Sequence, residues 1–197
     1  MGLVAAAAFV LAIQSSPSLT IIRDPAIRPT QVSKARLDEI WGHIDNRLIN
    51  QSDIWYEDGE FPNCVSLLRV QHAYSPDDQD VMTSLGWMLE NIELMDEARL
   101  VYKEFSDRNP EKGDAVFPLA FSYYNAKEWD NAIRVLEPSL SKNASPNTYR
   151  ILAKCYERKK MYKDAIRIWE LELKKFPDEP TAVANIKRVK AKIASGG

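Results

Sequence analysis

Residues 79–112 read QDVMTSLGWMLENIELMDEARLVYKEFSDRNPEK, and the spacing of large and small side chains in this stretch decides the fold. Met82, Leu85 and Leu89 follow one another at intervals of three and four residues, which places their side chains on one face of a helix. Gly86 lies in the same run, and its missing side chain allows another backbone to approach closely. The first part of the stretch therefore predicts an amphipathic helix with a small contact point.

The second part of the stretch predicts a partner helix. Ala98 stands four residues before Tyr102, so that a small and a large side chain share one face. Pro110 follows, and helices usually end at or before the residue that precedes a proline. Two helices joined by a short turn and closed by a proline are thus the basic unit.

The same unit recurs along the chain at a period of 33 or 34 residues, and such internal repetition indicates a stacked repeat architecture. The period appears in two series, Ala98, Ala132 and Ala165 in the second helices, and Trp55, Leu89, Tyr123 and Tyr156 in the first helices. The repeats fall at about 45–78, 79–112, 113–145 and 146–179. Because one unit cannot bury its apolar stripe alone, neighbouring units must stack.

Two of the repeats depart from the pattern. In residues 113–145, Ala144 stands where the closing proline is expected. In residues 45–78, the most divergent unit, Cys64 replaces the small alanine of the second helix.

The pattern as a whole resembles the tetratricopeptide repeat signature, W-x2-L-G-x2-Y followed by A-x3-F and a proline. The best copy carries, in that order, Met82, Leu85, Gly86, Leu89, Ala98, Tyr102 and Pro110. The resemblance implies an all-α fold, a right-handed α-solenoid of about four helix-turn-helix repeats whose first helices line a concave groove.

Both ends of the array are predicted to carry an additional helical segment. At the front, a helix begins near Ser33 and continues to about Tyr56. At the back, residues 180–194 form a C-terminal capping helix. We expect this helix to face the stack through Val183, Ile186, Val189 and Ile193.

The N-terminal residues differ from the rest of the chain. Residues 1–14 contain an uncharged apolar run that is typical of a secretory signal, although no Lys or Arg precedes it. Residues 15–32 contain three prolines and are predicted to be a linker ahead of the tetratricopeptide domain, residues 33–197. We expect an exported, periplasmic or envelope-associated protein, with residues 1–14 available as a membrane tether. A cytoplasmic protein with an apolar tail is the alternative.

The sequence offers no constellation for catalysis. His43 and His72 lie on different predicted helices, without another Cys or His at metal-ligand spacing. Cys64 and Cys155 lie three repeats apart, so we expect two free thiols. No glycine-rich phosphate loop is present. We therefore expect no enzymatic activity, no metal and no cofactor.

The distribution of charge is more informative than its sum. The net charge of −2 does not favour a nucleic acid partner. Residues 33–112 carry 17 acidic and 8 basic side chains, whereas residues 146–197 carry 6 acidic and 13 basic ones. This separation would orient a charged partner or drive head-to-tail self-association. Chance and the solvation of a terminal helix are the alternative explanation.

The resemblance also implies which residues line the groove. The exposed positions of the first helices carry aromatic side chains that the core pattern does not require, and a basic series at four-residue spacing on one helical face. The predicted site is Trp87, Phe117, Phe121, Tyr124, Asn125, Arg150, Lys154 and Arg158. Aromatic and arginine side chains are favoured at the centres of interfaces. A solvated basic face beside partly buried aromatics is the alternative.

We therefore expect a protein-interaction scaffold that binds a peptide or helical segment of a protein partner in its concave groove. A self-assembling structural scaffold, and hence a homo-oligomer, is the alternative. A repeat fold by itself does not specify a partner.

Overall fold

The computed structural model describes residues 34–195. The predicted signal-like segment, residues 1–14, and the predicted linker, residues 15–32, lie outside the described residues. The chain divides into two compact units, residues 1–41 and 42–197. Helix α1 (Lys34–Glu57) begins in the first unit and continues into the second, which carries all the other elements described below.

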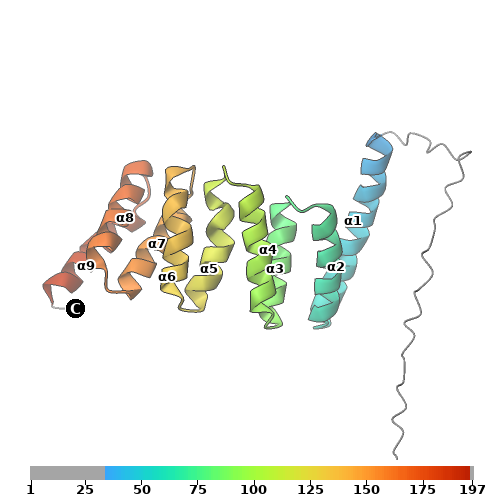
Figure 1. Ribbon diagram of the computed structural model, residues 1–197, viewed down its shortest axis with the longest axis horizontal. Coiled ribbons are helices and arrows are strands. Elements are labelled where there is room, and N and C mark those ends of the chain that lie inside the picture. Colours follow the sequence, from blue (N-terminus) through green and yellow to red (C-terminus); the bar gives the residue numbers. More distant parts are fainter. Residues whose placement is uncertain (1–33, 196–197) are drawn as a thin grey trace, which may run out of the picture. The chain divides into compact units, whose positions relative to one another are not determined.

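Every regular element in residues 34–195 is helical, which confirms the predicted all-α helical-repeat fold. After α1 the helices are α2 (Phe61–Tyr74), α3 (Gln79–Asn91), α4 (Met95–Arg108), α5 (Phe117–Asn125), α6 (Trp129–Leu136), α7 (Pro146–Arg158), α8 (Tyr162–Lys175) and α9 (Thr181–Ala194). Two short 3-10 helices, η1 (Gly113–Val116) and η2 (Glu137–Ser141), interrupt the series. Within the second unit α2 to α9 stack in chain order, each against its neighbours (Figure 1).

Prolines end three of the four second helices, as the sequence predicts. Helices α2, α4 and α8 end at Tyr74, Arg108 and Lys175, and in each case Pro76, Pro110 or Pro177 follows two residues later. Proline disfavours helical conformation at the residue before it and supplies no N–H to continue the hydrogen-bond ladder. The chain therefore turns at these points into the next repeat.

The turns between first and second helices share one backbone geometry. Each contains a residue with positive φ: Gly59 (77°), Glu93 (64°), Lys127 (62°) and Lys160 (60°). The next residue donates its backbone N–H to a carbonyl five residues earlier, namely Glu60 to Trp55 (2.7 Å), Leu94 to Leu89 (2.9 Å), Glu128 to Tyr123 (2.9 Å) and Met161 to Tyr156 (2.9 Å). This hydrogen bond is the one that closes a helix in the Schellman motif. Its acceptors are the same four residues whose recurrence in the sequence shows the period.

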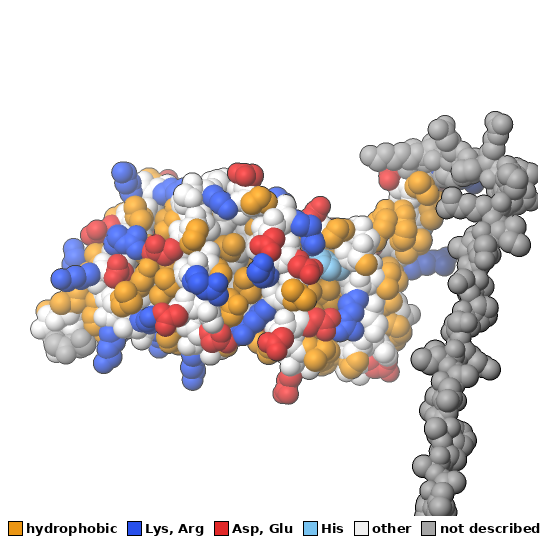
Figure 2. Space-filling view, in the orientation of Figure 1, with side chains coloured by type: hydrophobic (Ala, Val, Ile, Leu, Met, Phe, Trp, Pro, Cys, Tyr) orange, Lys and Arg blue, Asp and Glu red, His pale blue; other side chains and the backbone are white. Residues whose placement is uncertain are grey.

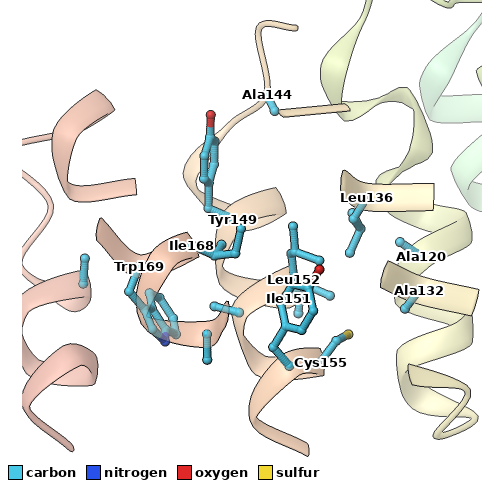
Figure 3. Packing of buried hydrophobic residues seen from close by; sticks show 14 residues of the cluster. Ala120, Ala132, Leu136, Ala144, Tyr149, Ile151, Leu152, Cys155, Ile168 and Trp169 are labelled. Carbon is cyan, nitrogen blue, oxygen red and sulfur yellow. The ribbon is translucent and has the colours of Figure 1, made fainter. Parts of the chain in front are cut away.

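The small residues of the pattern lie where the paired helices touch. Gly86 is buried, and Ala98, Ala120, Ala132, Ala153 and Ala165 are all 0 % exposed. A Cβ atom built on Gly86 would overlap the ring of Tyr102, the large residue of the partner helix. In the later repeats the same positions pack with Leu136, Leu152 and Trp169 (Figure 3). The small residues that define the pattern are therefore buried at the contacts between helices.

The core is built from two hydrophobic clusters, with polar contacts between them. One cluster extends from Cys64 to Leu119 and the other from Ala120 to Ala182, and the half-buried Tyr123 packs against both. Arg99 of α4 spans the junction: its guanidinium lies 4.6 Å from the Tyr123 ring, donates to Ser122 Oγ (3.3 Å) and pairs with Glu128 (2.8 Å).

The third repeat closes differently from the others. Its second helix, α6, has only 8 residues and passes directly into η2, which contains Pro138. Gly113 lies so close to Ala144 that an added Cβ atom would be 2.6 Å from the Ala144 nitrogen. Asp114 accepts hydrogen bonds from the Ser145 backbone N–H (2.9 Å) and the Thr148 hydroxyl (2.6 Å). These contacts fix the start of α7 without the proline that is missing at Ala144.

The capping helix α9 packs through only part of the predicted face. Ala182 and Val189 are buried and Ile186 is half-buried, whereas Val183 and Ile193 are 56 % and 45 % exposed. The expectation holds for Ile186 and Val189 and was wrong for Val183 and Ile193, because it selected large residues at every third or fourth position. The contact with α8 instead uses the small Ala182 as its point of close approach.

The close approach at Gly86 can be tested by adding one methyl group. Gly86→Ala should destabilise the protein by about 1–3 kcal/mol, because the new Cβ overlaps the Tyr102 ring within a packed core. Gly42→Ala is the matched control: nothing lies within 4 Å of its added Cβ, and alanine is the better helix former by about 1 kcal/mol. Chemical denaturation of both variants measures the difference. Equal stability of the two would contradict the contact.

Candidate functional site

The described residues contain neither a group of metal-ligating side chains nor a helix that could span a membrane. No three His, Cys, Asp or Glu side chains within residues 34–195 are grouped so as to hold a metal ion. Among the described helices, none combines the length and the apolar character that crossing a bilayer requires. Cys64 and Cys155 are both buried and unpaired. The burial of Cys155 raises its pKa to about 12, which makes its thiol unreactive at neutral pH.

Three of the predicted site residues form a continuous aromatic surface on α5. Phe117, Phe121 and Tyr124 follow at intervals of four and three residues and so share one helical face. The Phe117 and Phe121 rings are 5.9 Å apart and inclined by 11°, and the Phe121 and Tyr124 rings are 6.3 Å apart and inclined by 9°. Trp129 contacts the Tyr124 ring edge-on at 5.1 Å. We call Phe117, Phe121 and Tyr124 the α5 aromatic stack; its central ring, Phe121, is 42 % exposed.

Two further predicted residues, Lys154 and Arg158 of α7, meet this stack at a basic hollow. The hollow has a volume of about 500 Å³. It is lined by Tyr124, Lys154, Glu157, Arg158, Lys160, Tyr162, Arg188 and Lys192. In the space-filling view, Lys and Arg side chains are dense over the α8 and α9 end of the array (Figure 2). Asn125 is exposed at the end of α5 and does not line the hollow.

Glu157, the acidic residue in this lining, is already neutralised. Both its oxygens accept from Arg188 at 2.7 Å, and Oε1 also accepts from the Trp169 indole N–H at 3.1 Å. Its side chain is only 9 % exposed. The hydrogen bonds that Arg188 donates to Glu157 raise the pKa of Arg188, which therefore stays charged. This group connects α9 to α7 and α8 and fixes one wall of the hollow.

Arg150, predicted to continue the basic series, is turned away into the structure. Its Nε donates to Glu172 (2.8 Å), and its terminal NH2 nitrogen donates to Glu179 (2.5 Å). Glu172 is 0 % exposed, and its burial raises the pKa of its carboxyl against the lowering effect of Arg150. Burial of Arg150 alone would lower its pKa, but the hydrogen bonds to the two carboxylates outweigh this and raise it. Arg150 thus serves the fold and adds little free positive charge to the groove.

Trp87 lies in a second hollow, whose lining includes no residue of the α5 aromatic stack. Its ring is 6.1 Å from that of Tyr56, which in turn is 5.7 Å from that of Phe61. This hollow, of about 280 Å³, is lined by Ile49, Ser52, Asp53, Tyr56, Leu68, Gln71, Ser84, Trp87 and Met88. The predicted groove residues thus line more than one hollow: Tyr124, Lys154 and Arg158 line the first, Trp87 the second, and Phe117 another one.

Sequence reasoning missed the contribution of the capping helix and of the α7–α8 turn. Arg188 and Lys192 of α9 line the hollow together with Lys160 and Tyr162, and none of these four residues belongs to a first helix of a repeat. A signal was present, since Arg188 and Lys192 are four residues apart, as Lys154 and Arg158 are. Which side of α9 faces α7 could not be deduced without the correct packing face of α9.

Comparison with known proteins supports the fold. No family model matches the chain, and no curated protein does. A crystal structure of MamA matches with a TM-score of 0.58 and 19% identity over 73% of this chain and 84% of that chain. Another crystal structure of MamA gives 0.57 and 19% identity, over 75% and 81%. MamA 41-end from Desulfovibrio magneticus RS-1 gives 0.56 and 16% identity, over 76% and 85%. At these identities the likeness shows a shared TPR-like helical-repeat fold.

The buried ion pair of Arg150 and Glu172 predicts that removing Arg150 causes a large, pH-dependent loss of stability. Arg150→Ala should cost about 3–5 kcal/mol near neutral pH, because it leaves a buried carboxylate unpaired. Without Arg150 the pKa of Glu172 rises further, so the folded state takes up a proton and the loss should be smaller at about pH 5 than at about pH 8.

Denaturation across pH measures this effect. Arg158→Ala, an exposed arginine on the same helix, is the control and should change stability by about 0.5 kcal/mol or less. Adding Glu172→Gln to Arg150→Ala should remove the pH dependence. A loss of stability that is independent of pH would contradict the assigned role of Glu172.

Proposed function

We propose that this protein is an interaction scaffold that binds a segment of a partner protein over the α5 aromatic stack and the neighbouring α7 surface. The observation that carries the proposal is the stack itself: three parallel or nearly parallel rings on one helical face, with Phe121 exposed at its centre. Aromatic side chains held in this way are favoured anchors at interface centres. A binding role agrees with the TPR-like fold, whose first helices offer a repeated surface.

The stack is prepared for binding at low entropic cost. Phe117 and Tyr124 hold the Phe121 ring on both sides, and Trp129 supports Tyr124 from its edge. Side chains that are already ordered lose little freedom when a partner arrives, so more of the contact energy is expressed as affinity. Catalysis, by contrast, has no support from any group in the hollows of the described residues.

Self-association is the second candidate, and the separation of charge favours it. In the second unit, residues 42–112 carry 15 acidic and 6 basic side chains, and residues 146–197 carry 6 acidic and 13 basic ones. Val183 and Ile193 are exposed apolar residues at the basic end. Contacts between unlike surfaces of identical chains build closed rings or open filaments. Size-exclusion chromatography with light scattering at several salt concentrations distinguishes this candidate from a monomeric scaffold.

Export or envelope association remains part of the proposal and rests on residues 1–14 alone. Fusion of residues 1–31 to a reporter that is active only outside the cytoplasm should give a signal, because the uncharged apolar run is of the kind that export machineries recognise. The control carries two charged residues in that run. A reporter that stays entirely in the cytoplasm would contradict the proposal of export.

Photo-cross-linking tests the proposed binding surface. A photoreactive phenylalanine analogue at position 121 should yield a discrete cross-linked product in the native host, because this ring faces the partner. The matched control is the same analogue at Leu171 of α8, which is 40 % exposed and should give none. Once a partner is identified, Phe121→Ala should reduce the free energy of binding by about 2 kcal/mol, mainly through faster dissociation. Cross-links from position 171 but not from 121 would overturn the assignment.

A further inference from the structure

We infer that the basic hollow between α7, α8 and α9 binds acidic side chains of the partner segment, so that the capping helix forms part of the binding site. The inference rests on the proposed function and specifies the chemistry of its partner. It adds Lys160, Tyr162 and Lys192, which the aromatic surface does not include.

Free positive charge converges on this hollow. Five cationic residues line it: Lys154, Arg158, Lys160, Arg188 and Lys192. Of these five, only Arg188 makes an ion pair in the described part of the chain. Elsewhere on α7 and α8 the arginines Arg150 and Arg167 are paired with carboxylates, whereas the hollow gathers four cations that have no such partner among the described residues. The hollow therefore retains a net positive charge after every internal pair is counted.

The geometry of two facing helices makes the hollow a receptor for a small anionic group. Lys154 and Arg158 are one turn apart on α7, and Arg188 and Lys192 are one turn apart on α9. Cations on opposite walls repel one another, and a concave site focuses their potential. A carboxylate between the walls relieves that repulsion and gains charge-assisted hydrogen bonds. Glu157 does not act as this internal anion because Arg188 and Trp169 already engage it.

The position of Tyr124 links the hollow to the aromatic surface. Tyr124 is both a lining residue of the hollow and the last ring of the α5 aromatic stack. A partner segment that lies over the stack thus reaches the cations within a few residues. We therefore specify the partner as a peptide segment in which a large apolar side chain is followed or preceded closely by two or more Asp or Glu residues.

Charge also argues against a long polyanion or a flat anionic membrane. Beyond the α5 region the array becomes acidic, with 15 acidic and 6 basic side chains in residues 42–112. A nucleic acid that followed the array would meet this repulsive field within a few nucleotides. A bilayer surface would not enter a concavity of about 500 Å³ between helices. A short acidic stretch avoids both problems.

Fluorescence anisotropy with defined peptides tests the inference. The probe is a labelled peptide with one Phe beside a run of Glu; its control has Gln in place of every Glu. The variant Lys154→Glu/Lys192→Glu should weaken binding of the acidic probe by about tenfold or more, equivalent to about 1.4 kcal/mol. The matched variant Lys174→Glu/Lys187→Glu makes the same change in net charge on α8 and α9 but outside the hollow, and should change binding by about twofold or less.

All four substituted lysines are exposed and make no ion pair in the described residues, so both variants should keep the thermal midpoint of the wild type. This measurement separates loss of the site from loss of the fold. A version of the probe with phosphoserine in place of Glu distinguishes the source of the anion: if it binds more tightly and with the same dependence on Lys154 and Lys192, the site is supported and its anion is a phosphate.

The outcomes separate the inference from the function beneath it. If the Gln peptide binds as well as the Glu peptide while Phe121→Ala weakens both, the scaffold function stands and the acidic site is overturned. If the two lysine variants lose affinity equally, the effect comes from the net charge of the protein and not from the hollow, and the acidic site is also overturned. The same holds if no acidic peptide binds, or if only vesicles with anionic lipids do. If a partner binds and its affinity changes neither with Phe121→Ala nor with the lysine variants, both proposals fail.

Discussion

The close approach of paired helices at small residues is the constraint on which the rest of the structure depends. Ala98, Ala132 and Ala165 have no exposed surface, and the facing small positions of the first helices are buried as well. Because interiors are packed to crystal-like density, helix pairs that touch at such points have little freedom to rotate about their own axes. Fixing that rotation decides which side chains each first helix presents outward. The α5 aromatic stack and the basic side of α7 are therefore consequences of where the alanines lie.

Features that depend on local packing could be predicted from the sequence, whereas features that depend on long-range partners could not. The helix pairs and their small contacts follow from a pattern that each repeat must satisfy by itself. The ends of α2, α4 and α8 follow from proline geometry. The left-handed residues of the turns gave no signal in three repeats, because Glu93, Lys127 and Lys160 occupy a conformation that usually calls for glycine.

The candidate site shows the same limit more sharply. Arg150 belongs to a regular basic series in the sequence, yet its guanidinium is engaged by Glu172 and Glu179, which lie 22 and 29 residues further along the chain. No periodic pattern reveals such a pair, because it depends on the crossing of α7, α8 and the turn that leads to α9. The wall that α9 contributes to the hollow was likewise hidden, since its packing face uses Ala182 where a larger residue was expected.

The contrast between paired and unpaired cations separates charge that holds the fold from charge that is available to a partner. Arg150 and Arg188 each meet a carboxylate that is largely or wholly buried, and such pairs fix the position of helices because breaking them leaves an uncompensated buried charge. Lys154 and Lys192 each lie four residues after one of these arginines, but neither makes an ion pair in the described residues. The structural pairs hold α7 and α9 in place, and the free lysines lie on the walls that these pairs position. Because the backbones of these walls are held in place, the lysines stay around one hollow, where an incoming anion relieves the repulsion between them.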